Sequence, residues 1–243
     1  MIDAHCHLQE FEDPGEAIEG LEAVICCGAD IESSKQAIQI AERFKNVYAT
    51  VGIHPEENKE IKRLRDEDTK KIFLELLSMP RVVAVGECGL DNGSDEEVEL
   101  FKFNIKLAKE MGLPLVVHCR NQFEKVFEMV DYDKVQMHCF TGNMEQMREC
   151  VRRGWYISFG GIVTFKSSHE LREVAKAVPE DKLLIETDAP YLAPEPVRGS
   201  RNTPANVKIV AAKIAEVRGT SINQIEKITS ENCRRLFFKT NGN

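Results

Sequence analysis

The sequence predicts an α/β protein, a (β/α)8 TIM-type barrel that occupies residues 1–243 as a single domain. Eight short apolar runs alternate with helix-like segments along the chain. The length of 243 residues suits one such barrel, which typically needs about 250. An open doubly wound sheet is the rival fold, but it normally carries a glycine-rich phosphate loop after its first strand. Here that position reads His5-Cys6-His7-Leu8-Gln9, which favours the barrel.

The apolar runs are rich in Val and Ile, and several are apolar almost throughout. Such runs are typical of parallel strands buried on both faces. We expect right-handed crossovers between them. The predicted strands are residues 1–7, 22–28, 47–54, 82–88, 114–119, 134–140, 155–160 and 182–187.

Amphipathic segments lie between these runs and after the last one. Ser33–Arg43 and Glu97–Met111 each carry their apolar residues on one side, as a helix covering a sheet does. Gly112-Leu113-Pro114 predicts the end of the second helix and the start of the next strand. Asn206–Arg218 and Ile222–Phe238 predict two further helices that close the chain.

Composition and charge exclude several classes of protein. Hydrophobic residues make up 42% of the chain and charged residues 30%, an ordinary globular balance that argues against disorder. The net charge of −8 supplies no global attraction to nucleic acid, so any phosphate site must be made locally. The first residues have neither the basic start nor the apolar stretch of a signal peptide, and no apolar run approaches about 18 residues, so we expect neither a signal peptide nor a membrane span. We therefore expect a cytoplasmic protein with no membrane partner, and we see no obligate protein partner.

The eight cysteines do not predict disulfides. They include no C-x-x-C pair, and most lie in apolar runs, as small buried side chains in a reducing compartment do. Several adjoin a candidate ligand on a strand. Because neighbouring strand residues point to opposite faces, we expect those cysteines to point outward, under the helices.

Ligand-type residues end the predicted strands. In an α/β barrel the carboxyl ends of the strands form the active site. A single buried histidine is more often a hydrogen-bonded core residue than a ligand, but six such residues at one level favour a metal site. Four imidazoles and two carboxylates suit Zn²⁺, Mn²⁺ or similar ions, and are enough for two metals sharing one ligand. The six residues are His5, His7, Glu87, His118, His138 and Asp188.

Motifs along the whole chain resemble the TatD-type deoxyribonuclease family of the amidohydrolase superfamily. The pair HCFTG and ETDAPYL is the most specific of these motifs. The motifs are DAHCHL at 3–8, GIHP at 52–55, GECGLD at 86–91, PLVVHCR at 114–120, HCFTG at 138–142 with ETDAPYL at 186–192, and RGSRNTP at 198–204.

The resemblance implies a 3′→5′ exonuclease that hydrolyses single-stranded DNA with two divalent metal ions, Zn, Mg or Mn. His5, His7, Glu87 and Asp188 would hold one ion. Glu87 would bridge to a second ion, which His118 and His138 would also hold. Two cations can clamp an anionic phosphodiester and lower the pKa of a water nucleophile. Asp188 and Glu87 are thus the candidate catalytic residues, and DNA 3′ ends are the expected partner.

Four further residues are candidates for binding substrate. Arg120 suits a phosphate, or it forms an ion pair with a barrel carboxylate. His54 hydrogen-bonds the departing phosphate, or it braces Glu87. Arg198 and Arg201 contact nucleic acid, although Arg201 alternatively fastens its loop. The sequence also departs from the family at Gln9, where Asp is common, and in the small, acidic segment 92–97.

Two other functions stay open. One is a related hydrolase of a cyclic amide, a lactone or a small phosphoester. Such enzymes often bridge their metals with a carboxylated lysine, and the strand-4 position here carries Glu87, which favours the nuclease. The other is a metal-binding scaffold without activity, and the complete set of ligand-type residues argues against it.

Overall fold

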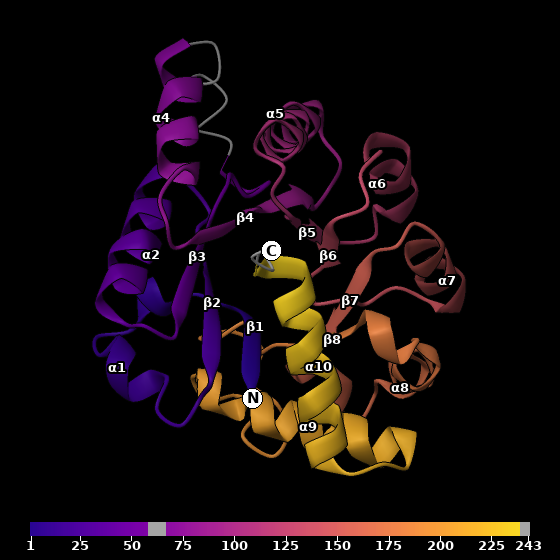
Figure 1. Cartoon of the computed structure of the whole chain (residues 1–243). Coiled ribbons are helices and arrows are strands. Elements are labelled where there is room, and N and C mark those ends of the chain that lie inside the picture. Colours follow the sequence, from indigo (N-terminus) through magenta and orange to yellow (C-terminus); the bar gives the residue numbers. More distant parts are fainter. Residues whose placement is uncertain (58–66, 239–243) are drawn as a thin grey trace, which may run out of the picture.

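The strands of the computed structural model form one parallel sheet in sequential order, β1 to β8 (Figure 1). The structure describes residues 1–57 and 67–238; the remainder of the predicted domain, 58–66 and 239–243, lies outside the described residues. The predicted α/β barrel is confirmed, and β4 alone extends beyond its predicted range. The strands are β1 Ile2–Cys6, β2 Ala23–Cys27, β3 Val47–Val51, β4 Val82–Leu90, β5 Leu115–Cys119, β6 Val135–Met137, β7 Tyr156–Phe159 and β8 Leu183–Ile185.

The first and last strands meet where their carboxyl ends continue as loops. The Asp188 amide donates to the carbonyl of His5 at 2.9 Å, and the His7 amide donates to the carbonyl of Ala189 at 2.7 Å. The buried carboxylate of Asp3 accepts a bond from the Thr187 amide at 2.9 Å. This closure places Asp188 beside His5 and His7, as expected for neighbouring strands of a closed barrel.

Helices surround the strands (Figure 1). The four predicted helices are present, with ends within two residues of those expected. Short 3-10 turns lie at Leu8–Glu10, Gly161–Thr164, Glu180–Lys182 and Pro204–Asn206. The α-helices are α1 Pro14–Ala17, α2 Ile31–Arg43, α4 Glu67–Leu77, α5 Asp95–Met111, α6 Phe123–Met129, α7 Met144–Arg152, α8 His169–Ala177, α9 Val207–Arg218 and α10 Ile222–Phe237. Among the described residues, no helix is both long and apolar enough to cross a membrane.

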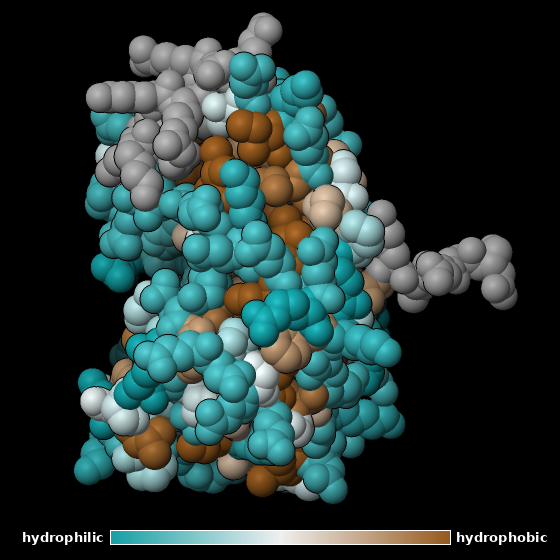
Figure 2. All heavy atoms as spheres, turned by 90° about the vertical axis from the view of Figure 1, so that its left-hand side faces the viewer, coloured by the Kyte–Doolittle hydropathy of each residue, from teal (hydrophilic) through white to brown (hydrophobic). Residues whose placement is uncertain are grey.

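Local signals explain where these helices begin and end. The Asp30 side chain accepts from the Ser33 amide at 2.8 Å and caps α2, whose inner face buries Ala37, Ile38 and Ala41. Gly112, in the left-handed region, ends α5. Figure 2 shows the side of the molecule formed by α1, α2 and α4 as mostly hydrophilic, with smaller apolar areas between the hydrophilic side chains. The apolar stripes of the helices are therefore mainly turned inward.

The core has two apolar layers. The larger layer lies between the strands and the helices and includes Val24 and Leu100. The smaller one fills the barrel and includes Ile25 and Leu184 from the strands. It also includes Phe237 at the end of α10, and Figure 1 shows this end of the helix over the middle of the ring of strands. Apolar packing thus fills much of the barrel interior, and the ligand-type residues lie at its carboxyl end.

Candidate active site

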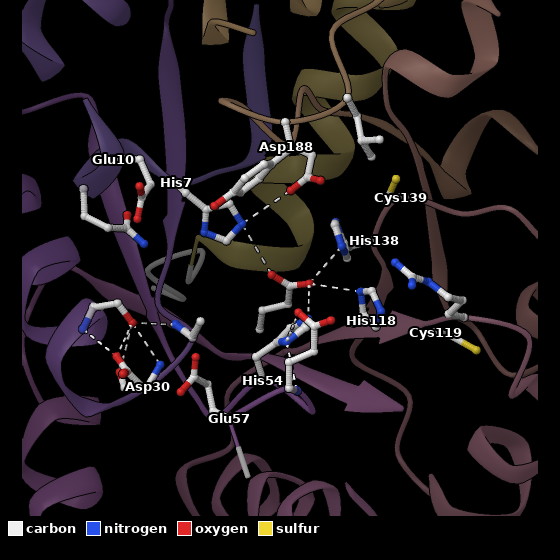
Figure 3. A pocket seen from close by; sticks show the side chains of 18 of the residues that line it. His7, Glu10, Asp30, His54, Glu57, His118, Cys119, His138, Cys139 and Asp188 are labelled. Atoms are coloured by element: carbon white, nitrogen blue, oxygen red, sulfur yellow. Dashed lines mark hydrogen bonds and ion pairs between the residues drawn. The ribbon is translucent and has the colours of Figure 1, made fainter. Parts of the chain in front are cut away.

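The Glu87 carboxylate lies among imidazoles, of which Figure 3 labels those of His7, His118 and His138. One of its oxygens, Oε2, is 3.3 Å from Nε2 of His5 and 3.5 Å from Nε2 of His7. The other, Oε1, is 3.3 Å from Nδ1 of His118 and 3.0 Å from Nε2 of His138. The two oxygens therefore face two different groups of histidines, which come from β1 and from the ends of β5 and β6.

Asp188 joins the first of these groups. Its Oδ1 is 3.6 Å from Nε2 of His5 and 3.4 Å from Nε2 of His7. The Asp188 backbone has a φ of +56°, a left-handed conformation that takes the chain out of β8 and over the barrel. The six predicted ligand-type residues thus lie together at the carboxyl end of the strands.

An irregularity in β4 brings Glu87 to the centre. The register between β4 and β5 shifts between Val85 and Cys88. Gly86, just before the carboxylate, has a φ of +134°, and a Cβ there would lie 2.6 Å from the carbonyl oxygen of Val116. A larger residue at position 86 would push β4 away from β5. The close packing of β4 against β5 therefore requires glycine at the first position of the GECGLD segment.

The ring nitrogens that face away from Glu87 also have partners. The Nδ1 of His7 is 3.0 Å from the carbonyl oxygen of Cys27, and the Nδ1 of His5 is 3.3 Å from the Cys27 thiol. The Nε2 of His118 is 3.0 Å from Asp91. The Nδ1 of His138 is 3.0 Å from Glu186. Such outer partners fix the tautomer and orientation of an imidazole ligand.

Glu186 is a residue whose function the sequence analysis missed. Fully buried, it accepts hydrogen bonds from Nε2 of Gln136 at 2.9 Å, from the Cys139 amide at 2.6 Å and from the Ser158 hydroxyl, besides its contact with His138. Burying a carboxylate is costly unless such donors satisfy its oxygens. An acidic residue directly after an apolar strand was the signal that could have revealed its importance.

Charge and burial act against each other inside the ring. Burial opposes ionisation of Glu87, but the imidazoles around it, His138 first, hold its pKa well below the ordinary value. Burial would likewise lower the pKa of His138, but the carboxylates of Glu87 and Glu186 on either side raise it well above that of a free imidazole. For His5, burial and the nearby His138 prevail and lower the pKa. The cluster therefore holds its carboxylates ionised.

The other predicted site residues lie around this centre. The Nε2 of His54 is 3.4 Å from Oε1 of Glu87. This is the contact expected if His54 braces Glu87 and does not bind a phosphate. The exposed Arg120 forms an ion pair with Asp91 at 3.1 Å. The guanidinium of Arg198 lies 4.0 Å from the centre of the Phe165 ring. Arg201 donates to the carbonyl of Glu10 and so ties its loop to the loop after β1.

The cysteines form no disulfides, as expected, but not all of them point away from the site. Cys6 belongs to the outer apolar layer and Cys119 packs against this layer at the edge of the cavity, whereas Cys139 lines the cavity over Glu87. The expectation is wrong for Cys139 because β6 ends at Met137, so strand alternation no longer applies there. The φ of +43° at Cys139 turns the chain further.

The residues that depart from the family pattern have structural roles. Gln9 donates to the carbonyl of Cys27 at 2.8 Å, the oxygen that also contacts His7. The buried Glu97 accepts hydrogen bonds from the amides of Asp91 and Gly93, each at 2.8 Å. Glu97 thus shapes the loop that carries Asp91 and contributes no charge to the surface.

A cavity of about 620 Å³ opens above the ring. The loops after β1, β2 and β3 contribute acidic residues to it, including Glu10, Asp30 and Glu57. The loops after β5 to β8 contribute Arg120 and, after β8, the apolar ring of Tyr191. Figure 3 shows Glu10, Asp30 and Glu57 on one side of the ring and Cys119 and Cys139 on the other. The opening therefore has an acidic half and a more apolar half.

Comparison with known proteins agrees with this geometry. The sequence model described as TatD related DNase matches residues 2–238. The chain belongs to this family. The "Uncharacterized metal-dependent hydrolase YabD" of Bacillus subtilis is 38% identical to it, over 98% of each chain. The "3'-5' ssDNA/RNA exonuclease TatD" of Shigella flexneri is 33% identical, over 90% of this chain and 88% of that one. The crystal structure of YJJV, a TatD homologue from Escherichia coli, superimposes with a TM-score of 0.84 at 28% identity and covers 98% and 97% of the two chains.

As a TatD-family protein, the chain is a metal-dependent hydrolase, and its donor atoms fit divalent ions. Three groups of ligand atoms each lie within 4.8 Å of one another: His5 with His7 and Glu87, His5 with His138 and Asp188, and His54 with Glu87 and His118. Imidazole nitrogens and carboxylate oxygens are ligands that Zn²⁺ accepts. Their outer ring nitrogens are occupied by hydrogen-bond partners, as in metal sites generally.

Proposed function

We propose that this TatD-family hydrolase is a 3′→5′ exonuclease that removes nucleotides from single-stranded DNA with two divalent metal ions. The observation that carries the proposal is the division of the Glu87 contacts, since each carboxylate oxygen faces a separate group of histidines. A carboxylate placed in this way suits a bridge between two ions. The name of the Shigella flexneri relative supports the choice of nucleic acid as substrate.

His5, His7, Glu87 and Asp188 would hold one ion. Glu87, His118 and His138 would hold the other. When bound, two such ions supply positive charge to an in-line displacement at phosphorus and lower the pKa of the attacking water. Mg²⁺, Mn²⁺ and Zn²⁺ all remain candidates for these positions, because the site offers both nitrogen and oxygen donors.

The protein side chains would do the rest of the chemistry. Asp188 accepts the proton of the attacking water, because its carboxylate lies at the edge of the ring and faces the cavity. Ionised carboxylates are needed for this, and the surrounding imidazoles lower the pKa of Asp188 despite its burial. Glu186 and Asp91 keep His138 and His118 turned toward Glu87.

Substrate binding would use residues around the cavity. Arg120 is exposed and can turn from Asp91 toward a phosphate of the bound strand. His54 lies close enough to the ring to donate to a phosphate oxygen beside Glu87. Arg198 and Arg201 would act chiefly by positioning the loop over the site, because both already contact neighbouring groups.

The test is an assay on 5′-labelled single-stranded DNA with EDTA and with added Mg²⁺, Mn²⁺ or Zn²⁺. We expect a ladder that shortens from the 3′ end, with nucleoside 5′-monophosphates as products and no cleavage in EDTA. Blocking the 3′ hydroxyl of the same oligonucleotide is the matched control. Parallel reactions on RNA and duplex DNA define the preference. Internal cleavage, or no cleavage with any of the metals, would contradict the proposal.

A second candidate is hydrolysis of a small lactone, cyclic amide or phosphoester. The acidic half of the opening favours it, since Glu10 and Glu56 repel a polyanion but not a neutral molecule. Incubation of the metal-loaded enzyme with a panel of lactones, dihydropyrimidines and small phosphodiesters tests this alternative. Turnover of a neutral compound far above that of oligonucleotides would favour it over the exonuclease.

A further inference from the structure

Two large apolar side chains are exposed directly above the metal-binding ring. Within residues 1–57 and 67–238, five large hydrophobic residues are exposed: Met79, Tyr191, Leu192, Val197 and Ile222. Three of them follow β8. Tyr191 and Leu192, which are 53% and 37% exposed, line the cavity over Glu87. Single exposed hydrophobic residues scattered over a surface are normal. An adjacent exposed pair at the opening of an active-site cavity instead indicates a surface that contacts a ligand.

The segment that carries this pair is held firmly. The Tyr191 amide donates to the carbonyl of Asp188 at 2.8 Å. The buried Asn202 side chain donates to the carbonyl oxygens of Thr187 at 2.9 Å and of Tyr191 at 2.7 Å. Hydrogen bonds thus fix the backbone on both sides of the exposed tyrosine. The ring also meets the imidazole of His7, with 5.8 Å between the ring centres.

Leu192 is exposed at a cost in backbone conformation. Its φ is +50°, a left-handed value that residues with a Cβ seldom adopt. The segment also presses on the loop after β7, where a Cβ at Gly161 would lie 2.0 Å from the Leu192 carbonyl oxygen. Backbone strain of this kind persists where the surrounding structure enforces it, and it clusters at functional sites.

The charges around the opening select the kind of ligand. Glu10 and Glu56, from the loops after β1 and β3, line the acidic half of the cavity. The carboxylates repel the phosphates of a bound strand, whereas an uncharged aromatic base is not repelled and can stack on the Tyr191 ring, which Glu10 also influences. Aromatic side chains stack on any base of a single strand, but a paired base inside a duplex already has both faces covered.

We propose that Tyr191, with Leu192 beside it, is a stacking platform for the base of a nucleotide that flanks the scissile phosphate. The inference rests on the proposed exonuclease function and gives it a physical basis for single-strand selectivity. The platform is formed before the substrate arrives, because the hydrogen bonds of Asn202 already fix its backbone. Its stacking energy contributes to binding without reading the base sequence.

The kinetic test compares Tyr191→Ala, Tyr191→Phe and Met79→Ala on three single-stranded oligonucleotides. One has all its bases, one has a tetrahydrofuran abasic unit at the 3′-terminal nucleotide, and one has it at the penultimate nucleotide. Met79→Ala is the matched control, because Met79 is an exposed hydrophobic residue at the opposite end of the barrel.

On the complete oligonucleotide we expect Tyr191→Ala to raise KM about tenfold with a smaller change in kcat, as loss of one stacked base predicts. Tyr191→Phe keeps the ring and should remain within about twofold of wild type. On one of the two abasic substrates the penalty for Tyr191→Ala should disappear. An equal penalty on all three substrates, or a Phe variant as poor as the Ala variant, overturns the proposal.

A binding experiment separates failure of this inference from failure of the exonuclease proposal. The probe is a 3′-blocked oligonucleotide with 2-aminopurine at either of the two positions, titrated with metal-loaded protein. Stacking on Tyr191 should quench the fluorescence with the wild type and not with Tyr191→Ala. Absence of quenching in the wild type, or equal quenching in the variant, overturns the platform. Absence of cleavage of unblocked oligonucleotides, with quenching intact, would instead overturn only the exonuclease.

Discussion

The barrel has a cavity at each end, and the larger one is not at the ring of imidazoles around Glu87. The cavity at the amino ends of the strands measures about 930 Å³, against about 620 Å³ above Glu87. Leu77, Met79 and Phe237 line the larger cavity. The smaller cavity contains the imidazoles and carboxylates that converge on one point. Convergent polar groups, rather than volume, therefore locate the chemistry.

The cations at the two ends also differ. At the amino end, Lys182 donates to the carbonyl of Gly154 at 2.8 Å and Lys134 to that of Gly112 at 3.3 Å, so both lysines satisfy exposed backbone groups. At the carboxyl end, Arg120 pairs with Asp91, whose carboxylate also contacts the His118 ring. The amino end is organised for stability and the carboxyl end for reaction, a division that variants at each end can test.

The largest effect on stability is expected at the amino end. Phe237 is 3% exposed and closes the barrel interior, so Phe237→Ala should lower the free energy of unfolding by about 3–5 kcal/mol. Urea unfolding measures it. Because Phe237 lies far from Glu87, kcat/KM at a temperature where the variant is folded should match wild type. A large loss of activity in fully folded protein would show that the two ends are coupled.

The largest effect on activity is expected at the carboxyl end. Glu87→Gln removes a charge that faces both histidine groups, and should lower kcat/KM and bound metal by at least about a hundredfold, more than loss of an outer hydrogen bond usually costs. Activity assays and metal analysis measure both. Glu216→Gln, an exposed glutamate, is the control. Near-wild-type activity with two ions bound would refute the bridging role.

The difference between the two ends explains how much the sequence could predict. The strands and the six ligand-type residues follow from a local rule, because apolar runs that end in His or Asp mark the carboxyl edge of a barrel. The outer partners do not follow from a local rule. Glu186 meets His138 across 48 positions of the chain, and Cys27 meets His5 across 22. Such contacts depend on the register of neighbouring strands, which the sequence pattern does not give.

Strand alternation had a similar limit. Within β2 the neighbours Cys26 and Cys27 do lie on opposite sides, Cys26 in the outer apolar layer and Cys27 inside the barrel. Alternation failed for Cys139, which lies two residues beyond the end of β6. Residues immediately after a strand take their direction from the loop, and these are the residues from which a barrel builds its active site.

An intermediate effect is expected for Glu186, which supports the ring without facing the cavity. In Glu186→Gln an amide would replace one carboxylate oxygen and meet hydrogen-bond donors such as Gln136, so His138 would lose its fixed orientation. We expect kcat/KM and metal affinity to fall about 10- to 100-fold. Glu180→Gln is the matched control, since Glu180 is exposed in a turn before β8. A change below about twofold would mean that His138 is oriented by packing alone.

The smallest effect concerns salt. If DNA contacts only the carboxyl end, the protein neutralises about two or three phosphates. Each neutralised phosphate contributes about −0.7 to the slope of log K, the binding constant, against log salt concentration. The slope should then be about −1 to −2 at fixed metal concentration. The net charge of −8 adds no long-range attraction. Arg198→Ala and Arg201→Ala should raise KM more than they lower kcat, because the loop that these arginines position affects binding in the ground state and the transition state alike.

The amino end supplies the means to break this prediction. The larger cavity is lined by Lys134, Lys182 and Arg235. A DNA strand that extended from the carboxyl end of the barrel to this cavity would make additional phosphate contacts. The double variant Lys134→Gln/Lys182→Gln should leave the salt slope unchanged, because the lysines bind backbone carbonyls instead. A wild-type slope steeper than about −4 that becomes shallower in this variant would show that the amino end also binds nucleic acid, and that the division between the two ends does not hold.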